Sequence, residues 1–264
     1  MTFLANEKKE KKHLPGWLVF LAVFTLCCAA GWFLIDKGLL WFNMPSNNLY
    51  PVRGVDVSHY QGNIEWDQLY EQGITFAFIK ATEGSGTVDE CFDANWLNAR
   101  AAGIAVGGYH FFSFDSPGSS QAENFCNIVP TAADALPPVI DLEYYRSDTQ
   151  PETEAVRREL STMLNTLQKR YGKQPIIYTT RSYWEKYLKG TELKYTLWIR
   201  SVYKAPSSDY DPQWTFWQYN PHGILKGFEG TESRIDLNVY RGTVSEFEQE
   251  FKLPAGSVRI YKSS

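Results

Sequence analysis

The segment Pro137–Tyr144, PPVIDLEY, combines the pattern of a buried β-strand with two acidic residues. Side chains alternate between the two faces of a strand, so Asp141 and Glu143 share one face with Val139. Two carboxyl groups side by side raise each other's pKa. A carboxyl group with a raised pKa can serve as a general acid. The segment therefore predicts both a strand and an acid–base site at its carboxyl end.

Apolar runs of the same kind alternate with helical patterns from residue 53 to residue 251. The other candidate strands are 53–58, 75–81, 104–112, 174–180, 195–201, 214–219 and 234–240, and the candidate helices are 64–72, 90–102, 119–129, 152–171 and 181–188. This alternation predicts an α/β fold with parallel strands, and eight strands predict a closed, TIM-like barrel. Because a complete (β/α)₈ barrel takes about 250 residues, we expect an irregular barrel in which loops or hairpins join the last three strands.

Two more acids lie in the first and last candidate strands. Asp56 and Asp236 are each flanked by apolar residues. The first and last strands of a closed barrel are neighbours, so these two acids are expected to lie together, at the same level as Asp141 and Glu143. Each acid alone is more simply explained as an ion-pair or capping partner. Four acids at strand ends favour an active site, which parallel barrels build at the carboxyl ends of their strands.

Aromatic residues gather at the same level. They end candidate strands or begin the loops that follow, as Tyr109, Tyr145, Tyr178, Trp198, Trp217 and Tyr219. Any one of them is more often part of a core. As a ring around an acidic cleft, they suit a carbohydrate, which offers apolar ring faces and many hydroxyl groups.

These motifs, in this order, closely resemble glycoside hydrolase family 25, the Chalaropsis-type lysozymes or N-acetylmuramidases. The segments that carry the resemblance are GVDVSHYQG (54–62), FAFIKATEG (76–84), GGYHFF (107–112), PPVIDLEY (137–144), IIYTT (176–180), LWIRSV (197–202), WTFWQY (214–219) and RIDLNVYRG (234–242). The resemblance implies a (β/α)₅β₃ barrel. It also implies cleavage of the β-1,4 bond between N-acetylmuramic acid and N-acetylglucosamine in peptidoglycan glycan strands. No metal or other cofactor is expected.

By the same resemblance, Glu143 is the catalytic acid and Asp141 the carboxylate that assists it. Asp56 and Asp236 are expected to tune and position the site. The substrate-binding aromatic residues are expected to be Tyr109, Tyr178, Trp198, Trp217 and Tyr219. Arg200 departs from the family, where a small residue is common, and this puts local loop contacts in doubt. Strand spacing does not decide whether the reaction retains the anomeric configuration, and the resemblance favours retention.

The segment 16–35 is apolar, uncharged and long enough to cross a bilayer, which takes about 20 residues. Lysines precede it, so the positive-inside rule predicts a cytoplasmic N-terminus and a periplasmic or extracellular catalytic domain. We expect a basic stub at 1–15, a transmembrane signal anchor at 16–35 and a tether at 36–52. A catalytic barrel at 53–251 and a tail at 252–264, with a possible last strand, complete the chain. A cleaved signal peptide is the alternative reading of the apolar segment.

The net charge of −4 comes without a basic stripe, which argues against nucleic acid as a partner. A monomer is expected. An exported domain permits a disulfide between Cys91 and Cys126, but two free thiols explain them equally well. The alternative function is a non-catalytic peptidoglycan-binding domain on a membrane tether. A chitinase-type barrel is disfavoured, because it would need an acid where Val139 stands.

Overall fold

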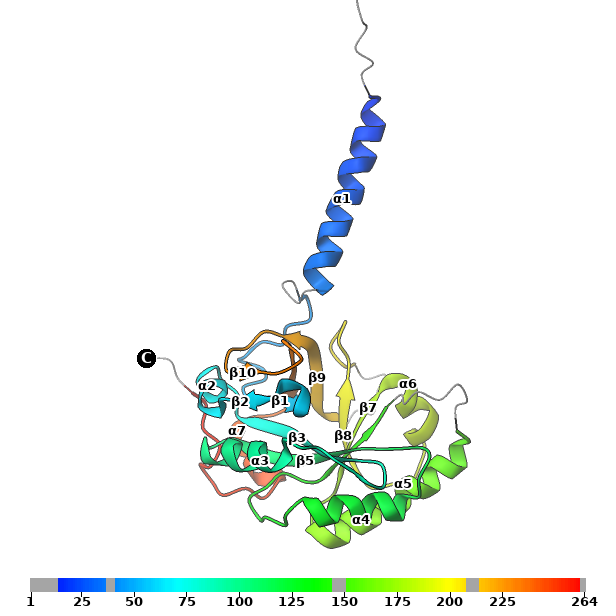
Figure 1. The fold of residues 1–264 in the computed structure, drawn as a ribbon, viewed down its shortest axis with the longest axis vertical. Coiled ribbons are helices and arrows are strands. Elements are labelled where there is room, and N and C mark those ends of the chain that lie inside the picture. Colours follow the sequence, from blue (N-terminus) through cyan, green and yellow to red (C-terminus); the bar gives the residue numbers. More distant parts are fainter. Residues whose placement is uncertain (1–13, 37–40, 144–150, 208–213, 262–264) are drawn as a thin grey trace, which may run out of the picture. The chain divides into compact units, whose positions relative to one another are not determined.

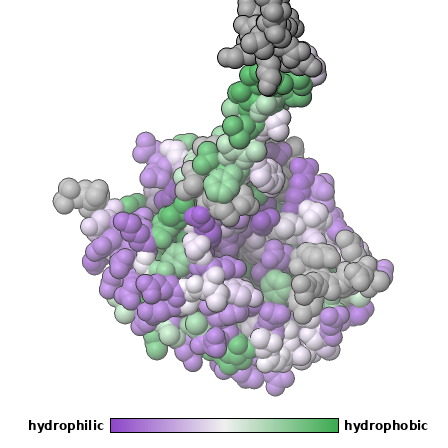
Figure 2. Space-filling model, turned by 45° about the horizontal axis from the view of Figure 1, so that its top comes forward, coloured by the Kyte–Doolittle hydropathy of each residue, from purple (hydrophilic) through white to green (hydrophobic). Residues whose placement is uncertain are grey.

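The structure is a computed structural model that describes residues 14–36, 41–143, 151–207 and 214–261. The chain divides into two compact units, residues 1–41 and residues 42–264. In the first unit, α1 (Gly16–Asp36) is the one described helix that is long and apolar enough to cross a membrane. Its hydrophobic side chains are exposed and contrast with the mainly hydrophilic surface of the second unit in Figure 2.

The second unit is built around a closed barrel (Figure 1). Its eight strands are β1 (Arg53–Val57), β3 (Phe76–Glu83), β5 (Ala105–Phe111), β6 (Val139–Leu142), β7 (Ile176–Thr180), β8 (Thr196–Arg200), β9 (Trp214–Gly223) and β11 (Ile235–Tyr240). Neighbours from β1 to β9 pair in parallel, and β11 closes the barrel antiparallel to both β9 and β1. All eight predicted strands are confirmed.

Helices follow the first five barrel strands, as the (β/α)₅β₃ prediction requires. They are η1 (His59–Gln61) with α2 (Trp66–Glu71), then α3 (Phe92–Ala101), α4 (Gly118–Ile128), α5 (Thr153–Tyr171) and α6 (Arg181–Tyr183), which continues as the π-helix η2 (Trp184–Leu188). The described residues between β8 and β11 contain no helix. Short strands complete the unit: β2 (Asn63–Ile64) pairs with β10 (Phe228–Glu229), and β4 (Thr87–Val88) pairs with β3.

Strand alternation separates two cores. In β3, Phe76 and Phe78 face the barrel interior, whereas Ala77 and Ile79 join the outer core beneath the helices. Gly54 makes room for this packing, because a Cβ atom there would lie 2.4 Å from the Phe76 ring. Large side chains thus fill the middle of the barrel, and the polar inward-facing residues collect at the carboxyl ends of the parallel strands.

The predicted tether and tail extend the folded unit rather than flank it. Residues 42–52 belong to the second unit, where Val52 is buried in the inner core and the Tyr50 ring packs against Trp217. The same holds for the described residues of the predicted tail, which end at 261. Leu253 and Val258 are buried in the inner core, and no strand forms there.

The unpredicted helix α7 (Val244–Glu250) precedes the tail and supplies Phe247 to the inner core. A capping box between Thr243 and Glu246 starts this helix. Elsewhere in the second unit, Cys91 and Cys126 are free thiols.

Candidate active site

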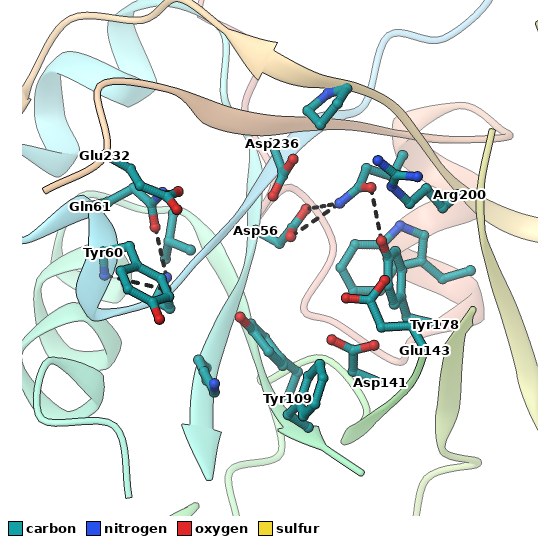
Figure 3. A pocket seen from close by; sticks show the side chains of 17 residues that line it. Asp56, Tyr60, Gln61, Tyr109, Asp141, Glu143, Tyr178, Arg200, Glu232 and Asp236 are labelled. Atoms are coloured by element: carbon teal, nitrogen blue, oxygen red, sulfur yellow. Dashed lines mark hydrogen bonds between the residues drawn. The ribbon is translucent and has the colours of Figure 1, made fainter. Parts of the chain in front are cut away.

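A pocket of about 390 Å³ opens at the carboxyl ends of the parallel strands (Figure 3). All four predicted acids line it: Asp56 from β1, Asp141 and Glu143 at the end of β6, and Asp236 from β11. Asp236 lies near the beginning of its strand, but β11 is antiparallel to β1 and brings its beginning to the same edge of the barrel. The closed topology therefore gathers acids that lie far apart in sequence.

Asp56 and Asp236 are direct partners in the β1–β11 pairing, and their carboxyl groups share a hydrogen bond. Burial raises the pKa of both. The rise is larger for Asp236, where the charge of Asp56 adds to burial. For Asp56, hydrogen bonds from Asn238 and Gln218 oppose the effect of burial on its pKa. Burial therefore acts against two negative charges on this pair, and the charge of Asp56 adds to that effect on Asp236.

Asp141 and Glu143 form the second acidic pair. Burial, then the charges of Glu143 and Asp56, raise the pKa of Asp141 well above its usual value. Burial also raises the pKa of Glu143, with a further contribution from Asp56. Asp141 is only 8% exposed, and its Oδ1 is buried without a hydrogen-bond partner in the described part of the chain. Glu143 is half-buried, so its carboxyl group is the more accessible of the two.

Two cations lie among these acids. Lys80 forms an ion pair with Glu83 at 2.7 Å between Nζ and Oε2. Arg200 projects into the pocket from β8, and its charge opposes the rise in pKa of Glu143, Asp56 and Asp236. The departure from the family at Arg200 therefore concerns the electrostatics of the pocket and not only local loop contacts.

Three of the predicted aromatic residues line the pocket, namely Tyr109, Tyr178 and Trp198. Trp198 is only 2% exposed and Tyr178 only 5%, so little of either ring can stack on a sugar. Their polar atoms point to neighbours instead. The Tyr178 hydroxyl donates to Gln218 Oε1 at 2.9 Å, and Trp198 Nε1 donates to Asn238 Oδ1 at 2.9 Å. Tyr145 lies outside the described residues.

Trp217 and Tyr219, which the sequence predicts to contact the substrate, do not line this pocket. Both are buried in a separate cluster with Val239 on the outer side of the barrel. The Trp217 indole N–H donates to the Ser201 carbonyl at 2.8 Å, and the Tyr219 hydroxyl accepts a hydrogen bond from Arg53. β9 continues beyond the predicted strand end. Its alternation turns Phe216 and Gln218 inward, and it turns Trp217 and Tyr219 outward.

The pocket also contains residues that the sequence analysis did not single out. Gln218 lies beside Asp56, while Tyr60, Gln61 and Glu232 line the opposite side in Figure 3. Asn238 donates to Asp56 from a fully buried position and does not itself line the pocket. Tyr60 is 47% exposed, which leaves its ring available to a ligand. A usable signal existed for Asn238 and Gln218. Asn238 is two residues from Asp236 and so shares its strand face. Gln218 is next to Trp217 and so lies on the opposite face of its strand.

Comparison with known proteins gives one consistent family. The model of glycosyl hydrolases family 25 matches residues 55–228. Lysozyme M1 of Streptomyces globisporus is 35% identical over 209 residues, which cover 74% of this chain and 69% of the lysozyme. A family 25 glycosyl hydrolase of Bacillus anthracis has a similar structure, with a TM-score of 0.73, 47% identity, and coverage of 79% of this chain and 97% of that chain. A bacterial lysozyme of Streptomyces coelicolor matches with a TM-score of 0.67 and 33% identity, covering 76% and 96% of the two chains. The chain belongs to family 25 of the glycosyl hydrolases and is a glycoside hydrolase.

Proposed function

We propose that the barrel is a muramidase, which hydrolyses the β-1,4 bond between N-acetylmuramic acid and N-acetylglucosamine in peptidoglycan. Family membership and the named lysozyme relatives support this substrate class. The observation that carries the proposal is the acidic pair Asp141 and Glu143, whose pKa values are both raised at the edge of an open pocket. Such a pair still holds a proton at a pH at which an ordinary carboxyl group has lost it.

Glu143 is assigned as the general acid, because its carboxyl group is the more accessible of the two. It donates its proton to the glycosidic oxygen as the bond to the anomeric carbon breaks. The leaving N-acetylglucosamine departs with that proton as its 4-hydroxyl group. Water then adds to the anomeric carbon and returns a proton to Glu143, which leaves N-acetylmuramic acid as the new reducing end.

Asp141 is assigned as the assisting group. Its unpartnered Oδ1 is an acceptor that needs a donor, and buried polar atoms rarely stay unpaired. The N–H of the 2-acetamido group is a suitable donor on this substrate. Held in that way, the acetamido oxygen can attack the anomeric carbon from the face opposite the leaving group. Water attack then displaces it, and two inversions amount to retention.

We place the barrel outside the cytoplasm, with α1 as the membrane anchor and the basic N-terminus inside. The length and apolar composition of α1 support this topology, and so does the lysine cluster before it. Protease protection in intact cells tests the orientation. Recovery of the full-length chain in the membrane fraction distinguishes an anchor from a cleaved signal peptide. A single monomeric size in detergent tests the expected oligomeric state.

Mass spectrometry of peptidoglycan fragments tests the activity directly. The full-length chain in detergent is incubated with purified peptidoglycan, and new reducing ends are identified. We expect reducing N-acetylmuramic acid. Reducing N-acetylglucosamine would indicate a glucosaminidase. Sedimentation with peptidoglycan but no fragments would indicate the non-catalytic binding domain.

A further inference from the structure

Asp56 lies at the centre of a hydrogen-bond network in the barrel interior, and Figure 3 shows the branch that reaches Tyr178. Its Oδ1 accepts from Asn238 Nδ2 at 2.6 Å, and both of its oxygens accept from Gln218 Nε2 at 3.1 and 3.2 Å. Asn238 and Gln218 are direct partners in the β11–β9 pairing. Two adjacent strands therefore present two amide N–H groups to one carboxylate.

The orientation of the Asn238 amide is fixed by Trp198. An indole N–H can only donate, and Trp198 Nε1 donates to Asn238 Oδ1 at 2.9 Å. The other end of the amide must then present Nδ2, which is a donor, to Asp56. Both Asn238 and Trp198 are buried, with 0% and 2% exposure, so water is poorly placed to replace either bond.

Tyr178 acts similarly on Gln218. Its hydroxyl donates to Gln218 Oε1 at 2.9 Å, which directs Nε2 toward Asp56. This restraint is weaker than the first, because a hydroxyl group can also accept. Two of the five aromatic residues that the sequence predicts as sugar contacts thus use their polar atoms to orient the two amides around Asp56.

The amide donors favour the charged form of Asp56 and oppose the effect of burial on its pKa. That charge in turn raises the pKa of Glu143 and of Asp141. The charged and titratable groups around Asp56 are Asp236 from β11, Arg200 from β8, Asp141 and Glu143 after β6, Lys80 from β3, and the phenols of Tyr109 and Tyr178. Among them, Arg200 also lowers the pKa of Asp56, and Lys80 lowers those of Asp141 and Glu143.

We propose that Asn238 and Gln218 are positioning residues that hold Asp56 as a carboxylate, and that Trp198 acts on the reaction through Asn238 rather than as a sugar platform. This inference deepens the proposed muramidase function and rests on it for its kinetic readout. The Trp198 indole orients the Asn238 amide, and the amide stabilises the negative charge of Asp56. That charge raises the pKa of Glu143.

The first test is Trp198→Phe in the full-length chain, because it keeps an aromatic ring and removes the orienting N–H. The titration of Asp56 is followed by carboxyl ¹³C NMR and assigned by its loss in Asp56→Asn. We expect the pKa of Asp56 to rise by about 1 unit. The alkaline limb of the kcat/KM profile should move to lower pH, because a smaller negative charge on Asp56 lowers the pKa of Glu143.

Trp184→Phe is the matched control. The Trp184 side chain is also buried, in the outer core, and its Nε1 has no hydrogen-bond partner among the described residues. This substitution removes an indole N–H that orients nothing, so the Asp56 titration and the alkaline limb should stay at their wild-type positions. If Trp198→Phe also leaves both unchanged and raises only KM, Trp198 is a sugar platform and the proposal is overturned.

A double-mutant cycle with Asn238→Leu tests whether the influence passes through the amide. Once Asn238 is replaced, Trp198 has no amide to orient, so the double variant should titrate like Asn238→Leu alone. Additive shifts would overturn the proposal. If circular dichroism shows that Asn238→Leu does not fold, the cycle is run with Gln218→Met and Tyr178→Phe on the parallel branch, with the same two outcomes. The NMR titration does not need activity, so an inactive wild-type chain would refute the proposed function without deciding this inference.

Discussion

Asp56 and Asp236 lie opposite each other across the antiparallel pairing of β1 with β11, and their carboxyl groups share a hydrogen bond. The last strand thus both closes the barrel and brings a second buried carboxyl group against Asp56. The charge of Asp56 also raises the pKa of Asp141 and of Glu143.

Replacing Asp56 with Asn should therefore weaken the hold of Glu143 on its proton. Asp56 raises the pKa of Glu143, so its neutralisation lowers that pKa. A general acid must be protonated to act, and the alkaline limb of the kcat/KM profile should move down by about 0.5–1 unit. An alkaline limb that stays in place would show that Asp56 does not influence the acid.

Replacing Arg200 with Gln should move the same limb in the opposite direction. The guanidinium lowers the pKa of Glu143, so its removal raises that pKa and extends activity to higher pH, by about 0.5–1 unit. Arg158→Gln is a suitable control, because Arg158 pairs with Glu159 on an exposed surface outside the pocket. A downward shift in Arg200→Gln would contradict the electrostatic role.

Replacing Asp141 with Asn should stabilise the fold at neutral pH. The pKa of Asp141 is raised in the folded state, so folding binds a proton that the unfolded chain releases above about pH 4. The free energy of unfolding therefore falls as pH rises from there to the folded pKa. At pH 7 the Tm of the variant should exceed that of the wild type by about 3–5 °C for each unit of raised pKa, and at pH 3 the gain should disappear. An equal gain at both pH values would refute this origin.

Replacing Trp217 with Phe should affect stability and not substrate binding. The indole packs outside the barrel interior and donates to Ser201, so its removal leaves a buried carbonyl without this partner. A loss of about 1–2 kcal/mol in the free energy of unfolding is expected, measured by urea denaturation, with KM for peptidoglycan unchanged. A raised KM with unchanged stability would instead show that Trp217 contributes to substrate binding.

The strands and the four acids could be predicted because alternation with a period of two is a local property. Asp141 and Glu143 share the inward face as predicted, and the neighbouring Ile140 and Leu142 join the outer core. Strand order around a closed barrel then brought Asp56 and Asp236 together.

What the sequence does not predict has physical causes in particular elements. Nearness to a strand end suggests Trp217 and Tyr219 as substrate contacts, whereas the face on which each lies decides its environment. Helix α7 has seven residues, too few for a clear helical period. Which polar side chains bond to one another across the barrel, as Trp198 does to Asn238, depends on strands far apart in sequence and cannot be read from any one of them.

Glu143→Gln tests the central claim most directly, because it removes the acidic proton and nearly preserves the shape of the side chain. The release of reducing ends from purified peptidoglycan by the full-length chain should fall by about 10²–10⁴-fold at every pH, with an unchanged Tm below the pH at which Glu143 ionises. Release at the wild-type rate by a folded Glu143→Gln variant would contradict the assignment of Glu143 as the catalytic acid.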